Sequence, residues 1–409
     1  MKKIAIVICC DTKQSETDYI CEKIKEFGCK PFVIDVSTSA GFKSTGDIKR
    51  EDVAKHGGKE WSHVEGGPQH ELLDLMSKGA RRVCVDLHSR GEIHGIFSAG
   101  GLQNTTIASN AMTALPIGFP KMIVSTVATG QRTFDKIVGI KDVTVMPSIS
   151  DFAGINIVSK IIVNNAVAAL VGMVQKAGNE IPKSSNTVIG STLMGATNDG
   201  VVNAIKHLEN EGLEVVSFHS TGAGGKVMEK LIDDKIINAT MDMTLHEVVY
   251  EYFGYGFGFG ADHRLESGVK NNIPMVVCPA GIDFMCQWEN AMFEDISERK
   301  FRWHNSTLAH VKLKKNEVID ISNIIIDRLN QSEPGKVVVV LPTDGTRTFT
   351  QKGEELYDRK VDDAIIETFK NNLRKDIPLK LVDLNFMDPL FSKFVANEML
   401  ELLKANKLV

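Results

Sequence analysis

The sequence predicts an α/β protein made of two Rossmann-like three-layer subdomains with mainly parallel sheets. Short apolar runs rich in β-branched residues alternate with amphipathic helical segments along the whole chain, as in successive βαβ units. The polar segment NEIPKSSN at residues 179–186 interrupts this alternation, and a new series starts after it. A length of 409 residues also suits two or more domains. We therefore expect one subdomain over residues 1–180 and another over residues 185–409.

Composition limits the classes of partner. The chain has 47 Lys and Arg against 52 Asp and Glu, a formal charge of −5, so no general affinity for nucleic acid is expected. Seven cysteines without CxxC spacing are typical of a reduced, cytoplasmic protein. The short apolar run at residues 1–8 indicates a first strand, not a signal peptide. No apolar stretch is expected to reach the length of a membrane span.

The first segment predicts a strand over residues 4–9 and a helix from Ser15, as N-cap, to Gly28. A second strand follows over residues 31–37. The turn between them, CDTKQS, lacks the GxGxxG dinucleotide fingerprint. Its polar residues either form the rim of a ligand site or merely start the helix; they are Asp11, Thr12 and Lys13. Residues 42–68 read as a mobile surface excursion, and their histidines fit no compact metal site, so no metal is predicted.

Two further turns follow strands in the same half. SAGGLQNT follows a strand that ends at Phe97, and VSTVATG lies at the end of a strand over residues 121–127. Both place hydroxyls and bare backbone amides at strand ends, where they suit phosphate. Parallel strands end at one edge of a sheet, so these turns are expected to converge there. The candidate contacts are Ser98, Gly100, Gly101, Asn104, Thr105, Ser125, Thr126, Thr129 and Gly130.

Residues 151–178 predict one long, largely apolar helix. Its small residues suit a brace between the domains or a subunit contact, and a buried core helix explains the same pattern. The second half then restarts with a strand over residues 187–191 and a helix over residues 201–210.

The sequence FHSTGAGGKVMEKLI, residues 218–232, predicts the end of a strand, a glycine-rich turn and the start of a helix. Glycines without a Cβ let an anion approach the backbone amides, which the helix dipole also favours. A tight turn that binds nothing is the alternative. The candidate ligand contacts here are Ser220, Thr221, Gly222, Gly224 and Gly225.

Titratable residues also gather after the later predicted strands. The run GYGFGFG at residues 254–260 suggests a flap, and further strands are expected within residues 273–284 and 337–349 and at LKLV, with LKLVDLNFMDP closing the sheet. The candidates for chemistry are His219, Glu247, Arg264, Asp283 and His304.

Several of these segments also carry a family resemblance. CDTK, MIVSTVATG, FHSTGAGGKVMEKLI, MDMT, ADHRLESG, CPAGIDF and RWHNSTL, in this order, resemble the family of the tomato mosaic virus resistance protein, whose N-terminal part is a Tm-one-like ATP-binding domain. Most members are microbial proteins without an assigned reaction. The resemblance covers nearly the whole chain and implies two Rossmann-like subdomains, ATP binding and a homodimer. One departure is Leu102 and Gln103, in a turn that the family makes rich in glycine and serine.

Three functions remain open from the sequence. In the first, the chain binds a nucleotide, ATP with or without Mg²⁺, through the glycine turns and Lys13. In the second, it is an enzyme acting on a small carbonyl or carboxylate compound in an interdomain cleft. There His219 or His304 is the acid and base, Arg264 clamps a carboxylate, and Asp283 or Glu247 orients a histidine or holds a metal. In the third, it is only a partner-docking module.

Overall fold

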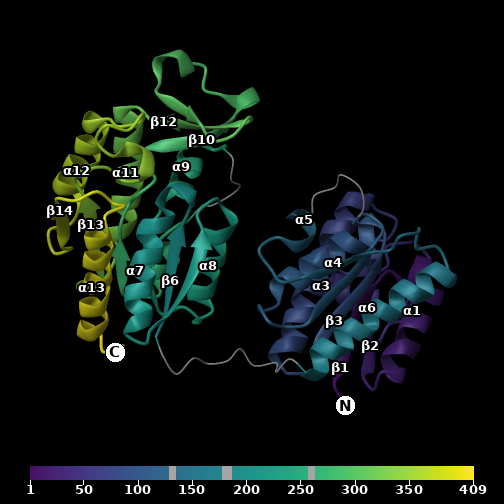
Figure 1. Ribbon diagram of the computed structural model, residues 1–409. Helices are drawn as coiled ribbons and strands as arrows, with labels where there is room; N and C mark the ends of the chain where they lie inside the picture. The colour runs from purple at the N-terminus through teal and green to yellow at the C-terminus, as the bar shows by residue number, and fades with distance from the viewer. Residues whose placement is uncertain (129–134, 177–186, 257–262) are drawn as a thin grey trace. The chain divides into compact units, whose positions relative to one another are not determined.

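The computed structural model describes residues 1–128, 135–176, 187–256 and 263–409. It divides into two compact units, Met1–Pro182 and Lys183–Val409. Each has an open sheet of parallel strands with helices on both faces (Figure 1). The predicted α/β class with Rossmann-like subdomains is therefore confirmed.

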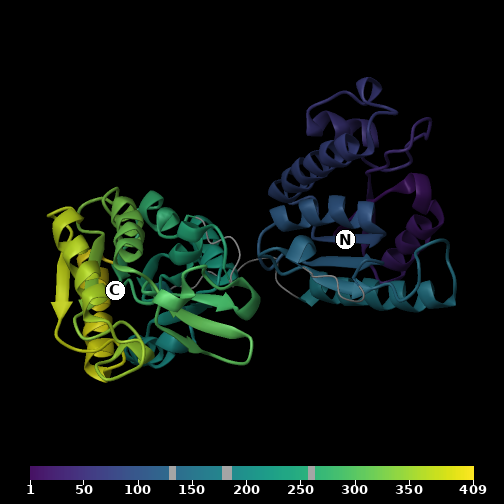
Figure 2. The ribbon, with the colours of Figure 1, turned by 90° about the horizontal axis from the view of Figure 1, so that it is seen from above.

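The N-terminal unit holds a five-stranded parallel sheet in the order β2-β1-β3-β4-β5. Helices α1 and α6 cover one face of this sheet, while α2, α3 and α4 cover the other (Figure 2). The elements are β1 (Lys3–Ile8), α1 (Cys10–Glu26), β2 (Lys30–Asp35), α2 (Arg50–Gly57), η1 (Trp61–His63), α3 (Gln69–Ser89), β3 (Gly95–Gly100), α4 (Leu102–Ala114), β4 (Lys121–Ser125), α5 (Asp135–Val138), β5 (Thr144–Pro147) and α6 (Ile157–Lys176).

The C-terminal unit repeats this plan with six parallel strands in the order β14-β13-β9-β8-β6-β7. Helices α7 and α13 pack on one face, and α8, α9, α11 and α12 pack on the other. The elements are β6 (Val188–Leu193), η2 (Gly195–Thr197), α7 (Asn198–Asn210), β7 (Glu214–His219), α8 (Ala223–Asp233), β8 (Ala239–Asp242), α9 (His246–Phe253), α10 (Glu266–Lys270), β9 (Met275–Val277), β10 (Phe284–Trp288), η3 (Glu289–Ala291), η4 (Ile296–Glu298), β11 (Phe301–Trp303), β12 (Leu308–Lys312), α11 (Lys315–Leu329), β13 (Val337–Pro342), η5 (Thr348–Thr350), α12 (Arg359–Asn372), β14 (Leu379–Val382) and α13 (Pro389–Ala405).

Each of the two parallel sheets has its own topological switch point. In each sheet the first strand lies between the second and the third: β1 between β2 and β3, and β6 between β7 and β8. The connection after the first strand runs to one side of the sheet and the connection after the third strand runs to the other. Open α/β sheets bind ligands at the carboxyl ends of the strands where the direction changes in this way.

Several local predictions differ from the structure. The helix α1 begins at Cys10, directly after the first strand, so Ser15 lies inside it and is not the N-cap. Residues 42–68 were expected to form an irregular excursion, but they contain α2 and η1, with Val53 and Trp61 buried in the core. The small antiparallel sheet β10-β12-β11 was not predicted.

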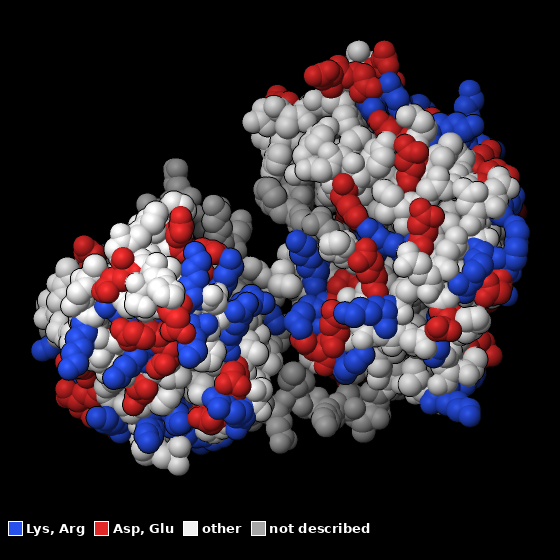
Figure 3. Space-filling model, turned by 180° about the vertical axis from the view of Figure 1, so that it is seen from behind, with Lys and Arg blue, Asp and Glu red and all other residues white. Residues whose placement is uncertain are grey.

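The long apolar segment forms α6, which has a mean hydropathy of 1.9 and is long enough to cross a membrane by length and composition. The expectation that no stretch reaches this length was therefore wrong. Core helices of soluble proteins meet the same criterion, and α6 packs Val163, Val167 and Leu170 into the core beside sheet β2-β1-β3-β4-β5. On the face shown in Figure 3, lysine and arginine are interspersed with aspartate and glutamate on each unit.

Candidate functional site

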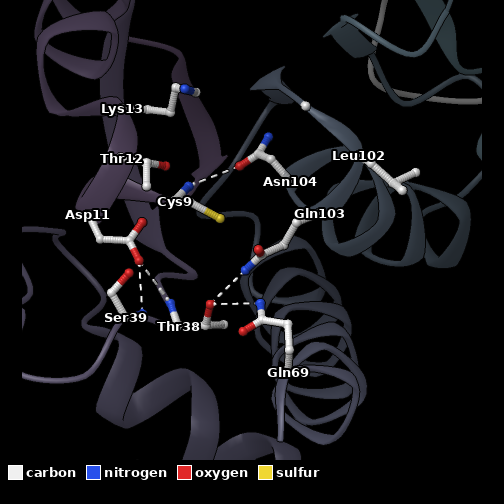
Figure 4. Close-up of a pocket in the computed structure, with 11 residues that line it drawn as sticks. Cys9, Asp11, Thr12, Lys13, Thr38, Ser39, Gln69, Leu102, Gln103 and Asn104 are labelled. Atoms are coloured by element: carbon white, nitrogen blue, oxygen red, sulfur yellow. Dashed lines mark hydrogen bonds between the residues drawn. The ribbon is translucent and has the colours of Figure 1, made fainter. Parts of the chain in front are cut away.

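A pocket of about 430 Å³ lies at the switch point of the N-terminal sheet. Its walls come from the residues that follow β1, β2 and β3 and from the start of α3 (Figure 4). The lining residues are Cys9, Asp11, Thr12, Lys13, Thr38, Ser39, Gln69, Gly101, Leu102, Gln103 and Asn104. Its size falls within the range of pockets that hold small ligands.

The start of α4 is the part of this pocket whose backbone amides suit an anion. Its N-cap is Gly101, and no side chain in the described residues caps the helix. The amides at its start therefore have no helical acceptor, and they carry the positive end of the helix dipole. Among the described residues, a Cβ on Gly101 would meet only Thr126 Oγ1, at 3.7 Å, which is an ordinary van der Waals contact.

The start of α1 faces the same pocket but is already satisfied. The amide of Cys10 donates to Asp35 Oδ1 at 3.3 Å, and the amide of Asp11 donates to Ser37 Oγ at 2.9 Å. The helix is then kinked at Lys13, with φ −134° and ψ 30°. Of the two helix starts, α4 is therefore the one available to a phosphate, and Lys13 supplies a cation at the rim.

The opposite wall is held by side-chain amides. Gln103 Nε2 and Gln69 Nε2 both donate to Thr38 Oγ1, at 2.6 and 3.2 Å (Figure 4). Asp11 Oδ2 accepts from the amides of Thr38 and Ser39, at 3.2 and 2.9 Å, whereas Asp11 Oδ1 has no hydrogen-bond partner in the described chain. One carboxylate oxygen thus remains for a hydroxyl or a cation.

The predicted glycine turns divide into lining and supporting residues. Of the predicted N-terminal set, Asp11, Thr12, Lys13, Gly101 and Asn104 line the pocket. The others in the described chain are not lining residues: Ser98 and Gly100 lie at the end of β3, Thr105 in the first turn of α4, and Ser125 and Thr126 at the end of β4. Thr129 and Gly130 lie outside the described residues.

The supporting residues fix Asn104, which joins the two strands. Asn104 Oδ1 accepts from the amide of Cys9 at 2.9 Å, and its Nδ2 donates to Ser98 Oγ at 2.7 Å. Ser98 Oγ in turn donates to the carbonyl of Val7 at 2.7 Å. This buried network holds the start of α4 beside the end of β1. The sequence predicted Asn104 and Ser98 as ligand contacts, and the structure adds that both hold the start of α4 in place.

The glycine turn after β7 is filled by the chain itself. Glu247 Oε1 accepts from the amides of Gly222 and Gly225, at 2.8 and 2.9 Å. The predicted anion is thus replaced by a carboxylate of α9. Gly224 passes close to the backbone, since a Cβ there would lie 2.2 Å from the carbonyl oxygen of His219. Ser220 is buried and donates to the carbonyl of Thr244, and Thr221 lies beside His219.

Arg264 completes this internal cluster. Its Nε donates to Glu247 at 2.6 Å, and its two terminal nitrogens donate to Glu229 at 2.8 Å and Asp242 at 2.7 Å. Burial alone would lower the pKa of Arg264, but the three carboxylates raise it. The guanidinium is fully buried, and each of its three nitrogens donates to a carboxylate of the chain, so its contacts are internal and do not indicate a clamp for a substrate carboxylate.

The backbone on both sides of Arg264 is strained. His263 and Leu265 both have φ of 72°, the left-handed region that residues with a Cβ avoid. Such residues cost on the order of 1–3 kcal/mol each, and the structure holds them in place through the Leu265 amide, which donates to Glu229 Oε1 at 2.6 Å. The cluster around Arg264 therefore stabilises an unfavourable local backbone.

The remaining candidates for chemistry lie apart from this cluster. Asp283 is buried and accepts from Lys312 Nζ at 2.8 Å and Arg347 Nε at 3.1 Å. Burial opposes its ionisation, but these two cations outweigh burial and hold the pKa of Asp283 well below its usual range. His219 is exposed at the end of β7, and His304 is exposed near His310. In the described chain the hydrogen-bond partners of Asp283 and Glu247 include no histidine.

These two parallel sheets match a family by sequence. The model for the N-terminal domain of the uncharacterised protein family UPF0261 matches residues 2–179, and that for its C-terminal domain matches residues 186–403. The chain belongs to this family. The UPF0261 protein of Clostridium tetani is 35% identical over 94% of this chain and 94% of its own length.

The chain is also similar to the tomato protein whose family its sequence resembles. The ToMV resistance protein Tm-1 of Solanum lycopersicum is 28% identical over 94% of this chain, which covers 54% of the tomato protein. The predicted family resemblance is therefore confirmed. Among solved structures, a UDP-N-acetylglucosamine 2-epimerase from Rickettsia bellii aligns with 99% of this chain and 96% of its own, at 11% identity and a TM-score of 0.23, and this likeness carries no argument.

Asp362, a buried residue in the C-terminal unit, gives a prediction of how the stability of the fold depends on pH. Neither oxygen of Asp362 has a hydrogen-bond partner in the described residues, and Lys312 Nζ lies 4.0 Å away. Burial raises the pKa of Asp362 to about 7. Its unfolded pKa is about 3.9, so the protonated form stabilises the fold below that pH, and this contribution is lost as pH rises to about 7.

Asp362→Asn is therefore expected to match the wild type near pH 4 and to be more stable at pH 8, by on the order of 2–4 kcal/mol. Urea unfolding at a series of pH values measures the difference. Asp363→Asn, which changes the half-exposed neighbouring carboxylate, is the control and is expected to show a small, nearly constant difference. Equal pH profiles for Asp362→Asn and wild type would contradict the assignment.

Proposed function

We propose that the chain binds a nucleotide, ATP, in the pocket of the N-terminal unit. The observation that carries the proposal is the uncapped start of α4, which opens into a pocket of about 430 Å³ at the switch point of a parallel sheet. Phosphate oxygens accept from such amides, and the helix dipole favours their charge. Lys13 adds a cation on the same pocket.

The other side of the pocket suits the sugar and the metal. Asp11 Oδ1 is available to accept from a ribose hydroxyl or to contact a Mg²⁺ ion carried by the phosphates. Thr38, Gln69 and Gln103 add hydroxyl and amide groups that form hydrogen bonds with neutral polar atoms. The residues thus fit a polyanion at one end and a neutral polar group at the other.

The C-terminal switch point contrasts with this pocket. There the amides of Gly222 and Gly225 donate to Glu247, whose carboxylate is held by Arg264. A nucleotide phosphate would have to displace a buried, paired carboxylate, which costs several kcal/mol. This comparison favours the N-terminal pocket as the nucleotide site.

A single exposed residue tests the proposal. Leu102 is the first residue of α4 and is 62% exposed, so its replacement disturbs little packing. Leu102→Asp places a negative charge at a helix start, which is favourable for the fold but repels a phosphate. We expect ATP affinity to fall by about tenfold or more in Leu102→Asp. Isothermal titration with ATP, Mg²⁺-ATP, ADP and inorganic phosphate measures it.

Leu102→Asn is the matched control, because it has nearly the same shape without the charge. It should bind ATP more tightly than Leu102→Asp. Lys13→Gln should also weaken ATP binding, whereas Lys25→Gln, on the exposed side of α1, should not. No ATP binding by the wild type, or equal affinity in the Asp and Asn variants, would sink the proposal.

The cytoplasmic homodimer expected from the sequence belongs to the same proposal. The half of α6 that faces away from the core carries Ile157 and Ile161, which are 73% and 54% exposed and suit a contact with a second copy. Sedimentation velocity of the purified chain tests this, and a monomer at every concentration would rule it out.

A further inference from the structure

Arg347 is buried with two of its donor groups unpaired. It follows β13 at the N-cap of η5, and its exposed fraction is 0%. Its Nε donates to both oxygens of Asp283, at 3.1 and 3.2 Å. Its two terminal nitrogens, Nη1 and Nη2, have no hydrogen-bond partner in the described residues. A buried donor without an acceptor costs about 1–3 kcal/mol, and such groups in native proteins call for a functional explanation.

One aromatic ring packs on this guanidinium, and two further rings pack on that ring. Its Cζ lies 3.8 Å from the centre of the Phe284 ring. On Phe284, the ring of His246 stacks at 4.2 Å and that of His310 packs at 4.8 Å. His310 is 4% exposed, and its Nδ1 is also without a partner in the part of the chain that the structure describes. Arg347 and His310 therefore both have unused polar atoms beside the same ring.

The charges of the cluster leave an excess of positive charge. Burial lowers the pKa of His310 to about 3 and that of His246 to about 4, so both rings are neutral at neutral pH. Arg347 and Lys312 face one ionised carboxylate, Asp283, while burial raises the pKa of Asp362. A buried environment with this excess favours an added anion.

The cluster lies at the carboxyl edge of the six-stranded sheet. Thr348 Oγ1 donates to the carbonyl of Ala196 in η2, directly after β6, at 3.1 Å. Met194 and Ala196 pack with Phe284 and Leu308 in one small apolar cluster. Arg347 thus adjoins the loop that follows the first strand of the sheet.

We propose that Arg347, with His310, binds the carboxylate of a small organic acid, whose apolar part packs against Phe284 and Leu308. The fork of Nη1 and Nη2 matches the two oxygens of a carboxylate, which accept two parallel hydrogen bonds. Lys312 and Arg347 Nε are both engaged by Asp283, so the two terminal nitrogens of Arg347 suit a monoanion better than a phosphate dianion. The site is separate from the nucleotide pocket and does not depend on it.

The test uses benzoate and 3-methylbutyrate on the full chain at constant ionic strength. At least one acid is expected to raise the melting temperature in a saturable way, and benzamide, the neutral analogue of benzoate, is expected not to. Arg347→Lys keeps a cation beside Asp283 but loses the planar fork, so it should weaken binding by about tenfold or more. Arg359→Lys, at an exposed arginine of the same unit, should bind like the wild type.

Three results would overturn the proposal: no saturable shift with either acid, equal binding by benzamide, or tighter binding of inorganic phosphate that also depends on Arg347. If Arg347→Lys does not fold, a crystal of the wild type soaked with 4-bromobenzoate decides. The anomalous signal of bromine is expected within contact of Phe284, and a signal only elsewhere would refute the site. Leu102→Asp should leave acid binding unchanged, which separates this result from the nucleotide proposal.

Discussion

Replacing Arg264 with methionine is expected to destabilise the C-terminal unit by about 3–5 kcal/mol or more, because it leaves three buried carboxylates without their cation. Methionine fills similar space, so the loss reflects charge more than a cavity. Urea unfolding followed by tryptophan fluorescence measures it. Two of the three tryptophans, Trp288 and Trp303, report on the C-terminal unit, and Trp61 reports on the N-terminal unit.

The control is Arg359→Met in the same unit. Arg359 pairs with Asp363, and both side chains are about half exposed, so this pair is worth only about 0–1 kcal/mol. The transition of Trp61 should not move in either variant if the units unfold separately. A loss below about 1 kcal/mol for Arg264→Met would show that the carboxylates are stabilised in another way.

Gly225→Ala is expected to destabilise the C-terminal unit by about 2–3 kcal/mol, although alanine is the better helix former. A Cβ at Gly225 would lie 2.0 Å from Glu247 Oε2 and 2.3 Å from Arg264 Nε. Both side chains are fully buried and hydrogen-bonded to each other, so neither is free to move aside. The steric cost therefore exceeds the gain in helix propensity, and urea unfolding measures the net effect.

Gly172→Ala is the same substitution at another helical glycine, but here it is expected to increase stability. Gly172 is inside α6, and a Cβ there would meet nothing within 4 Å. This variant is expected to stabilise the N-terminal unit by about 0.5–1 kcal/mol. If Gly225→Ala were as stable as the wild type, the close packing of Glu247 against the turn would be refuted.

Local patterns predicted most of the parallel strands and their order along the chain. The alternation of apolar strands with amphipathic helices depends on residues close in sequence, and so do the polar turn after β1 and the glycine turn after β3. Asp11, Lys13 and Gly101 could therefore be assigned to one edge of a sheet. Thr38 and Gln69 were missed because each reaches the pocket from a different connection, and neither has a motif of its own.

The prediction for the glycine turn after β7 illustrates the limit of such patterns. The local sequence of a glycine turn is the same whether its backbone amides are free or already donate to a carboxylate. The acceptor, Glu247, lies 22 residues beyond Gly225, and its own position depends on Arg264. Only the tertiary contacts distinguish a ligand site from an internal one. The antiparallel pairing of β10 with β12 was missed for a related reason, since η3, η4 and β11 lie between these two strands in the chain.

The order of the strands along the chain has a consequence for synthesis on the ribosome. The five strands of the N-terminal sheet end at Pro147, and the helix α6 that covers it ends at Lys176. The sheet therefore needs no strand from later in the chain. The N-terminal unit is therefore expected to fold while the rest of the chain is still being translated. In a nascent chain stalled well after residue 182, the N-terminal unit should already resist a protease before the C-terminal unit is complete.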